Sequence, residues 1–202
     1  MPIQSYVADE ELSRIFALID RATIMGKRDY AIIQIAATTR LRACDIICLR
    51  LTDIDWRKGE IHIKQKKTGH EVNLPLLSET AESLKDYILN ARPESDDNIL
   101  FLRISAPHKP ISNAVTIGEM FKRYQAKAGL SRQTLDDKGF HGLRRLLAKK
   151  LLISGTPSTA IAQILGHNDI NSVRQYLSLN IENIRECALD FSDIEVVRKK
   201  LM

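Results

Sequence analysis

Apolar residues recur at helical spacing near the start of the chain. Leu12 and Ile15 belong to a pattern that predicts an amphipathic helix over residues 8–24, ended by Gly26. Residues 28–38 are apolar on almost every side and predict a second, buried helix. The same criteria predict further helices over residues 43–49, 78–90, 113–128, 141–153, 157–165, 170–177, 181–189 and 192–201.

The period of the pattern changes in the middle of the chain. Apolar and polar residues alternate over residues 60–64 and again over residues 72–74, which is typical of strands with one buried face. Gly59 and Gly69 stand in the turns that precede these strands. With residues 52–56 they predict a three-stranded antiparallel meander. The fold class is therefore α+β: a mostly helical single domain with a small antiparallel sheet.

Composition narrows the class of protein. The 202 residues suit one domain, and 44% hydrophobic with 27% charged residues is ordinary globular usage. No apolar run approaches the roughly 18 residues of a membrane span, and residues 9–11 are acidic where a signal peptide would be apolar. Three cysteines in this spacing indicate neither a disulfide framework nor a zinc site. We expect a cytoplasmic protein without a metal.

Positive charge is concentrated in two segments. The chain carries a net charge of +5, and residues 40–67 and 132–150 each carry +4, so the remainder is slightly acidic. Two basic segments on such a chain favour a single anion-binding surface, as in nucleic-acid-binding proteins. The alternative is that they are solvated helix faces.

The second basic segment contains a pair suited to a phosphate. His141 and Arg144 are three positions apart at the start of a predicted helix, so they project from one face, with Leu143, Leu147 and Leu151 on the other side. A guanidinium group can bind two phosphate oxygens, and an imidazole exchanges a proton near neutral pH. Taken alone, the motif is better explained by an exposed histidine beside a surface arginine.

Two residues further along could take part in the same chemistry. His167 follows Gly166, which predicts a sharp turn after a helix, and Tyr176 comes nine residues later. A phenol is a poor nucleophile unless a base or a cation activates it. Taken singly, both residues are more often structural.

The first basic segment adds two more candidates. Arg42 begins a short predicted helix, and Asp45 three positions on could hold its guanidinium group or cap the helix. Lys67 lies in the predicted hairpin turn, from which it could reach a bound ligand. Hairpin lysines are usually only solvated.

In order and spacing these residues resemble the catalytic domain of the tyrosine recombinases, the phage integrase family. The family has T-G-L-R-x-x-E where this chain has residues 39–45, and K-T-G at residues 67–69. It has H-x-L-R, L-G-H and a tyrosine at residues 141–144, 165–167 and 176. The resemblance covers residues 8–190. All six catalytic positions are filled: Arg42, Lys67, His141, Arg144, His167 and Tyr176.

The chain departs from the family pattern at three places. Arg40 replaces a glycine, Gly142 replaces a common aspartate, and Arg145-Leu146 replaces a common His-Thr pair. None of these changes removes a catalytic group. Outside the catalytic set, the resemblance and the charge pattern make four residues candidate DNA contacts: Arg40, Lys64, Lys66 and Arg145.

The resemblance implies site-specific recombination of DNA through a 3′-phosphotyrosine intermediate. The two arginines, Arg42 and Arg144, would neutralise the phosphorane. His141 would accept the tyrosine proton, Lys67 would protonate the leaving 5′-oxygen, and His167 would donate to a nonbridging oxygen. Asp45 would support the site. This reaction needs no cofactor.

The resemblance also implies partners and an arrangement of domains. The partner is double-stranded DNA, on which a homotetramer is expected, with a monomer when free. Most family members have an N-terminal DNA-clamping domain, for which this chain has no room, so it is a fragment or a short member like the fimbrial-switch recombinases. Residues 190–202 are expected to form a helix that docks on a neighbouring protomer or folds back on its own domain.

Two alternatives remain open from sequence. A type IB topoisomerase uses a similar tyrosine and pocket, but relaxes DNA as a monomer. A non-catalytic DNA-binding regulator could keep the fold, although the complete catalytic set argues against it.

Overall fold

The computed structural model describes residues 7–39, 41–66, 69, 71–130 and 139–156. The helices predicted after residue 156, including residues 190–202, lie outside the described residues. The described elements are α1 (Asp9–Ala17), α2 (Ile24–Thr38), α3 (Ala43–Ile46), a 3-10 turn (Leu51–Asp53), β1 (Ile54–Asp55), β2 (Glu60–Lys64), β3 (Glu71–Pro75), α4 (Ser78–Asn90), α5 (Ala114–Lys127) and α6 (Phe140–Ile153).

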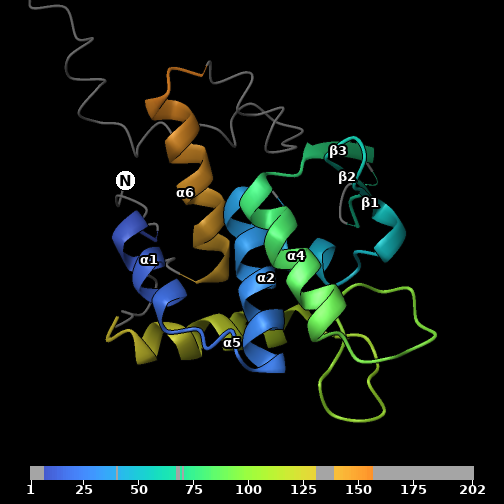
Figure 1. The fold of residues 1–202 in the computed structure, drawn as a ribbon. Coiled ribbons are helices and arrows are strands. Elements are labelled where there is room, and N and C mark those ends of the chain that lie inside the picture. Colours follow the sequence, from blue (N-terminus) through green and yellow to red (C-terminus); the bar gives the residue numbers. More distant parts are fainter. Residues whose placement is uncertain (1–6, 40, 67–68, 70, 131–138, 157–202) are drawn as a thin grey trace, which may run out of the picture.

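Helix α2 forms the centre of the domain. It packs against α4 and α6 and also contacts α3 and α5, so its surroundings are apolar on nearly all sides (Figure 1). Ala31, Ile32, Ile33 and Ile35 are accordingly all buried. The prediction of a buried helix is confirmed, because a helix without a polar face is stable only where other elements cover it.

The first helix is shorter than predicted. The expected helix over residues 8–24 ends at Ala17, and Gly26 lies inside the first turn of α2 instead of ending α1. The reason is Thr23, whose side-chain oxygen accepts the backbone N–H of Gly26 at 3.0 Å and so caps α2. A side chain at position 26 would collide with the carbonyl oxygen of Asp20. Glycine is therefore required here for close packing and not as a helix breaker.

The three-stranded antiparallel meander is confirmed, with strand order β1-β2-β3. Ile61 pairs with Ile54 on one side and with Leu74 on the other, which places the three apolar residues on one buried face. Gly59 and Gly69 have φ angles of 66° and 70°, as the turns between the strands require. The sheet lies beside α4, at the upper right of Figure 1.

Helix α3 is also shorter than the expected residues 43–49. Beyond its C-terminal end, Leu51 N–H donates to Asn98 O and Leu100 N–H donates to Leu49 O. These bonds pair residues 49–51 with the long connection after α4, so the Leu49 carbonyl and the Leu51 N–H are unavailable to a helix. The helices predicted over residues 78–90 and 113–128 are confirmed, with Asn113 capping α5 through its side chain.

Helix α6 begins one residue earlier than predicted and is buried differently. Leu143 is buried as expected, whereas Leu147 and Leu151 are only partly buried. Leu146 and Ala148 take their place in the interior. The difference arises because α6 contacts both α2 and α5, which cover it from two directions.

Candidate active site

Arg42 lies at the N-cap of α3, with extended backbone angles of −79° and 158°. Asp45, three residues on, is fully buried, and its Oδ2 accepts the backbone N–H of Arg42 at 3.2 Å. Of the two roles that the sequence left open, the carboxylate therefore takes that of helix cap. This bond fixes the backbone from which the Arg42 side chain projects.

The same carboxylate reaches the β2–β3 hairpin. Oδ1 of Asp45 accepts the backbone N–H of Lys66 at 3.0 Å. The hairpin turn is closed by Gly69, whose N–H donates to the carbonyl of Gln65 at 2.8 Å. Asp45 therefore ties the start of α3 to the residue that directly precedes Lys67 in the sequence.

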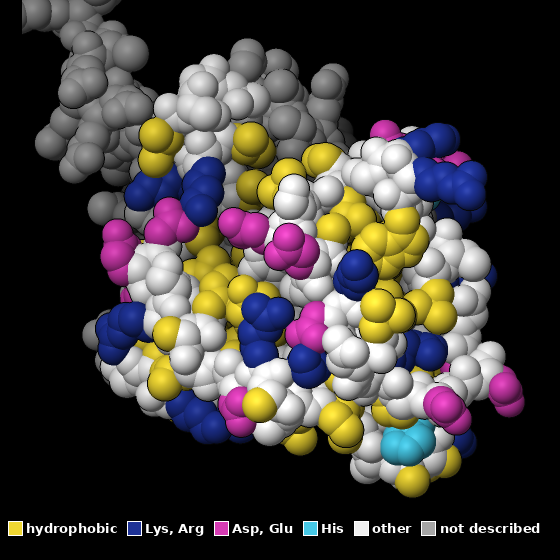
Figure 2. Space-filling view, viewed as in Figure 1, with side chains coloured by type: hydrophobic (Ala, Val, Ile, Leu, Met, Phe, Trp, Pro, Cys, Tyr) yellow, Lys and Arg dark blue, Asp and Glu magenta, His cyan; other side chains and the backbone are white. Residues whose placement is uncertain are grey.

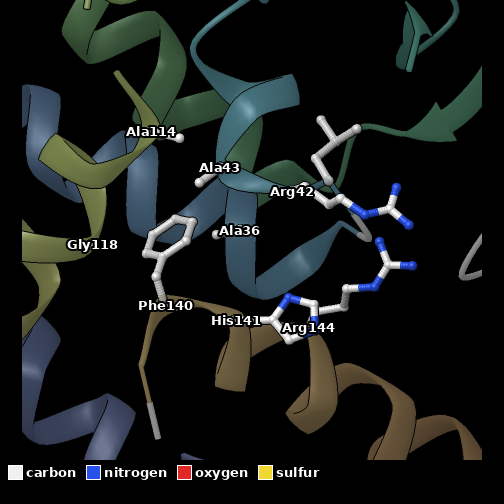
Figure 3. A pocket seen from close by; sticks show the side chains of 9 residues that line it. Ala36, Arg42, Ala43, Ala114, Gly118, Phe140, His141 and Arg144 are labelled. Carbon is white, nitrogen blue, oxygen red and sulfur yellow. The ribbon is translucent and has the colours of Figure 1, made fainter. Parts of the chain in front are cut away.

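One pocket brings together residues from both basic segments. Arg42, His141 and Arg144 line a cavity of about 100 Å³. Figure 3 shows the guanidinium groups of Arg42 and Arg144 next to each other, with the His141 ring beside Arg144. Arg144 is only 2% exposed, whereas His141 is exposed. Three of the six predicted catalytic residues thus meet, although α3 and α6 are far apart in the sequence.

The pocket is suited to an anion. Its other described lining residues are apolar or lack a side chain: Ala36, Leu41, Ala43, Ala114, Gly118 and Phe140. No described residue of the lining is acidic, and Nη1 of Arg42 is buried without a hydrogen-bond partner among the described residues. Burying a charged donor without an acceptor is costly, and an anionic oxygen would supply that acceptor. Two adjacent guanidinium groups can together hold the oxygens of a phosphate.

Cys44 lies between Arg42 and Asp45 in the sequence and is a free thiol. Burial, together with the negative charge of Asp45, raises the pKa of this thiol. Because the thiolate is the reactive form, the shift argues against Cys44 as a nucleophile.

The other predicted site residues are distributed as follows. Lys64 and Lys66 are exposed near the end of β2, and Arg145 on α6 is 8% exposed. Their DNA contacts stay predictions. Four predicted residues lie outside the described residues: Arg40, Lys67, His167 and Tyr176.

The sequence analysis did not single out Arg50. Its side chain is exposed and lines a second hollow together with Lys64 and Lys66. The available signal was its place in the basic segment of residues 40–67, but nothing in the sequence distinguishes it there from the other cations.

Within the described ranges, no three His, Cys, Asp or Glu side chains gather as metal ligands would. No helix in the described part of the chain is long and apolar enough to cross a membrane.

Comparison with known proteins identifies the family of the chain. The family model described as "Phage integrase family" matches residues 5–183, which is most of the chain. The chain belongs to the phage integrase family. The resemblance carried by the sequence motifs is therefore confirmed.

Two similar curated proteins come from Sinorhizobium fredii. The chain is 35% identical over 174 residues to the putative integrase/recombinase y4gC, covering 86% of this chain and 88% of the relative. It is 32% identical over 183 residues to the putative integrase/recombinase y4rA, covering 91% of this chain but only 44% of the relative. The chain therefore spans less than half of the longer protein.

Solved structures of recombinases have the same fold as this chain. The crystal structure of XerA recombinase matches with a TM-score of 0.74 and 26% identity, over 93% of this chain and 64% of that one. The lambda integrase catalytic core matches with a TM-score of 0.61 and 23% identity, over 82% of this chain and 93% of that one. The α+β fold class is confirmed.

Proposed function

We propose that residues 1–202 form the catalytic domain of a tyrosine recombinase, which cuts and rejoins DNA at specific sites through a 3′-phosphotyrosine intermediate. The observation that carries the proposal is the pocket in which Arg42 and Arg144 lie side by side with His141 and without an acidic neighbour among its described lining residues. The family membership of the chain supports it.

The two arginines would bind the nonbridging oxygens of the scissile phosphate. Their charge is most valuable when the phosphorus is five-coordinate, because negative charge on its oxygens is then greatest. Arg144 is buried and Arg42 half-buried in this pocket, so both groups would already lie beside each other before the substrate arrives. Little reorganisation is then needed during the reaction.

The remaining residues would carry protons. The phenol oxygen of Tyr176 attacks the phosphorus, its proton passes to His141, and the bond from phosphorus to the 5′-oxygen breaks as Lys67 donates a proton to that oxygen. His167 would donate a hydrogen bond to a nonbridging oxygen. Attack by a 5′-hydroxyl reverses these steps and restores the phosphodiester. Because the phosphotyrosine conserves the bond energy, the proposal requires no ATP, and we expect cleavage to persist in EDTA.

A covalent trapping experiment tests the proposal. The chain is incubated with short nicked duplexes of randomised sequence, so that the cleaved strand cannot rejoin, and adducts that survive SDS are isolated and the DNA sequenced. We expect an adduct with the unchanged chain and none with Tyr176→Phe. The variant should still bind DNA nearly as well, because the phenol oxygen is needed only for the covalent step.

The other outcomes separate the alternatives. DNA binding without any adduct in the unchanged chain would contradict the proposal and favour a non-catalytic regulator. A type IB topoisomerase would be favoured if the chain forms an adduct and, as a monomer, relaxes supercoiled DNA without exchanging strands between two duplexes.

We further propose that the domain acts in the cytoplasm and assembles as a tetramer on DNA. A lambda integrase tetramer bound to a Holliday junction is among the solved structures of this fold, with a TM-score of 0.64 and 23% identity. Residues 190–202 carry an apolar stripe that a neighbouring protomer could bury. Removing them should abolish assembly on DNA without unfolding the domain. A sharp fall in the melting temperature of the free chain would instead show that they pack on their own domain.

A further inference from the structure

A second basic hollow lies at the end of the β2–β3 hairpin. It has a volume of about 600 Å³, and its described lining includes the cationic residues Arg50, Lys64 and Lys66 and one acidic residue, Asp53. The cations come from two separate parts of the chain, since Arg50 precedes the 3-10 turn at Leu51–Asp53 and the lysines belong to the hairpin. In Figure 2, lysine and arginine side chains gather over the region of the sheet.

These cations have no partner among the described residues. Arg50, Lys64 and Lys66 are all exposed, and none forms an ion pair or a side-chain hydrogen bond with a described residue. The carboxylate of Asp53 binds the backbone of Arg50 and not its side chain, since Oδ2 accepts the Arg50 N–H at 2.8 Å. The described lining thus keeps a net positive charge that a phosphate could neutralise.

The hollow is connected to the arginine pocket through Asp45. Lys66 lines the hollow, and its backbone N–H is bound by Asp45, which also caps the helix that begins after Arg42. A DNA strand presents a phosphate for every 3.4 Å of rise along the helix axis. A strand with one phosphate at Arg42 and Arg144 would therefore have further phosphates within a short distance of it, and the hollow is the nearby basic surface that one of them could reach.

We propose that Arg50, assisted by Lys64 and Lys66, binds a second phosphate of the same DNA strand, close to the phosphate held at Arg42 and Arg144. Arg50 provides the directional contact, because a guanidinium group can bind two phosphate oxygens while a lysine acts as a point charge. The contact positions the strand and carries no sequence information. This inference rests on the proposed function.

A pair of matched variants tests the contact. Arg50→Gln removes the proposed phosphate ligand, and Arg57→Gln removes a cation of the same type from the same basic segment. Arg57 is likewise exposed, forms no ion pair with a described residue and does not line the hollow. Binding of the 202-residue chain to a DNA duplex is measured over a range of salt concentrations.

We expect Arg50→Gln to weaken binding and to reduce the slope of log K against log salt by about 0.9, the value for one lost phosphate contact. Arg57→Gln should leave the slope nearly unchanged. Circular dichroism of both variants should match the unchanged chain, because neither side chain forms an ion pair or a hydrogen bond with a described residue of the fold. Equal effects of the two variants would overturn the inference, since diffuse charge would then explain the binding.

Neutral phosphates locate the contact on the DNA. A methylphosphonate is placed at one backbone position at a time along the cleaved strand. At one position near the scissile phosphate, we expect it to weaken binding by the unchanged chain but to have no further effect on Arg50→Gln. If every methylphosphonate weakens binding by Arg50→Gln as much as it weakens binding by the unchanged chain, the second phosphate site is overturned, while the proposed recombinase function is not. If the unchanged chain binds DNA and forms no covalent adduct, the proposed recombinase function fails instead, while the phosphate contact can still be measured.

Discussion

Oδ1 of Asp45 accepts a hydrogen bond from the backbone N–H of Lys66 at 3.0 Å, across 21 residues of sequence. Because Oδ2 of the same carboxylate holds the N–H of Arg42, one buried side chain joins two parts of the proposed active site. The residue that follows Lys66 is Lys67, the proposed donor of a proton to the leaving group. We therefore expect Asp45 to act as a positioning residue for both Arg42 and the hairpin.

Asp45→Asn should reduce formation of the covalent DNA adduct by at least about tenfold, since a hydrogen bond to a charged group contributes roughly 1.5–3 kcal/mol. The amide keeps one acceptor oxygen but presents an NH₂ group to the second backbone N–H. Asp55→Asn is the matched control, because Asp55 also accepts two backbone N–H groups, from Arg57 and Lys58, but in an exposed turn. That variant should cleave at the normal rate.

A modified substrate separates positioning from a purely structural role. DNA in which sulfur replaces the bridging 5′-oxygen has a leaving group that needs no proton. If Asp45→Asn acts partly by displacing Lys67, this substrate should restore much of the lost cleavage. An equal defect on both substrates would exclude an effect through Lys67.

The paired guanidinium groups give a second prediction. Arg42→Lys and Arg144→Lys keep the positive charge but lose the planar fork, so each should slow adduct formation by at least about tenfold. The double variant should lose less than the product of the two single effects, because both residues act on one transition state. The rates of adduct formation by the single and double variants are measured under single-turnover conditions on a nicked duplex. Lysine variants that cleave at the normal rate would place the pocket outside the reaction.

The sequence predicted those features that depend on local pattern. The bounds of α4 followed from apolar spacing, and the buried face of β2 followed from the alternation around Ile61 and Ile63. The charge pattern favoured one surface for the two basic segments, but the pairing of Arg42 with Arg144 in particular came from the family motif, because no local rule relates residues on α3 and α6. The bond from Asp45 to Lys66 was not foreseen for the same reason, since it depends on how the hairpin packs against α3.

Gly26 shows how the same residue type can mislead. A glycine after an amphipathic segment usually ends a helix, and here it allows the backbone at Asp20 to approach α2. The sequence pattern cannot distinguish a glycine that ends a helix from one that allows close packing, because the approach of the Asp20 carbonyl depends on the folded structure.

Gly26→Ala and Gly118→Ala should therefore have opposite effects on stability. The first inserts a methyl group against the Asp20 carbonyl and should lower the free energy of unfolding by about 1–3 kcal/mol. The second places a methyl group in open space on α5 and should raise it by up to about 1 kcal/mol, since alanine favours helix more than glycine does. Urea unfolding of the two variants measures both. A neutral Gly26→Ala would mean that the α1–α2 connection moves freely.

A buried polar cluster gives a prediction about pH. Asp29 is fully buried, its Oδ1 binds the guanidinium group of Arg28 at 2.7 Å, and its Oδ2 accepts the phenol of Tyr124 at 3.2 Å. Burial, with the negative charge of Asp29, raises the pKa of Tyr124 to about 12. The folded state thus stabilises the neutral phenol.

Tyr124→Phe should lower the free energy of unfolding near neutral pH by about 1 kcal/mol, the usual contribution of one hydrogen bond. Above pH 10 the phenol ionises in the unfolded chain while it stays neutral in the folded one, so the unchanged protein loses stability that the variant never had. The advantage of the unchanged protein should therefore shrink between about pH 10 and pH 12. Urea unfolding of both proteins across this range measures the difference, in which contributions shared by both proteins, such as that of Tyr87, cancel. An advantage that stayed constant over the range would mean that Tyr124 titrates alike in the folded and unfolded chain, and that its bond to Asp29 does not hold the proton.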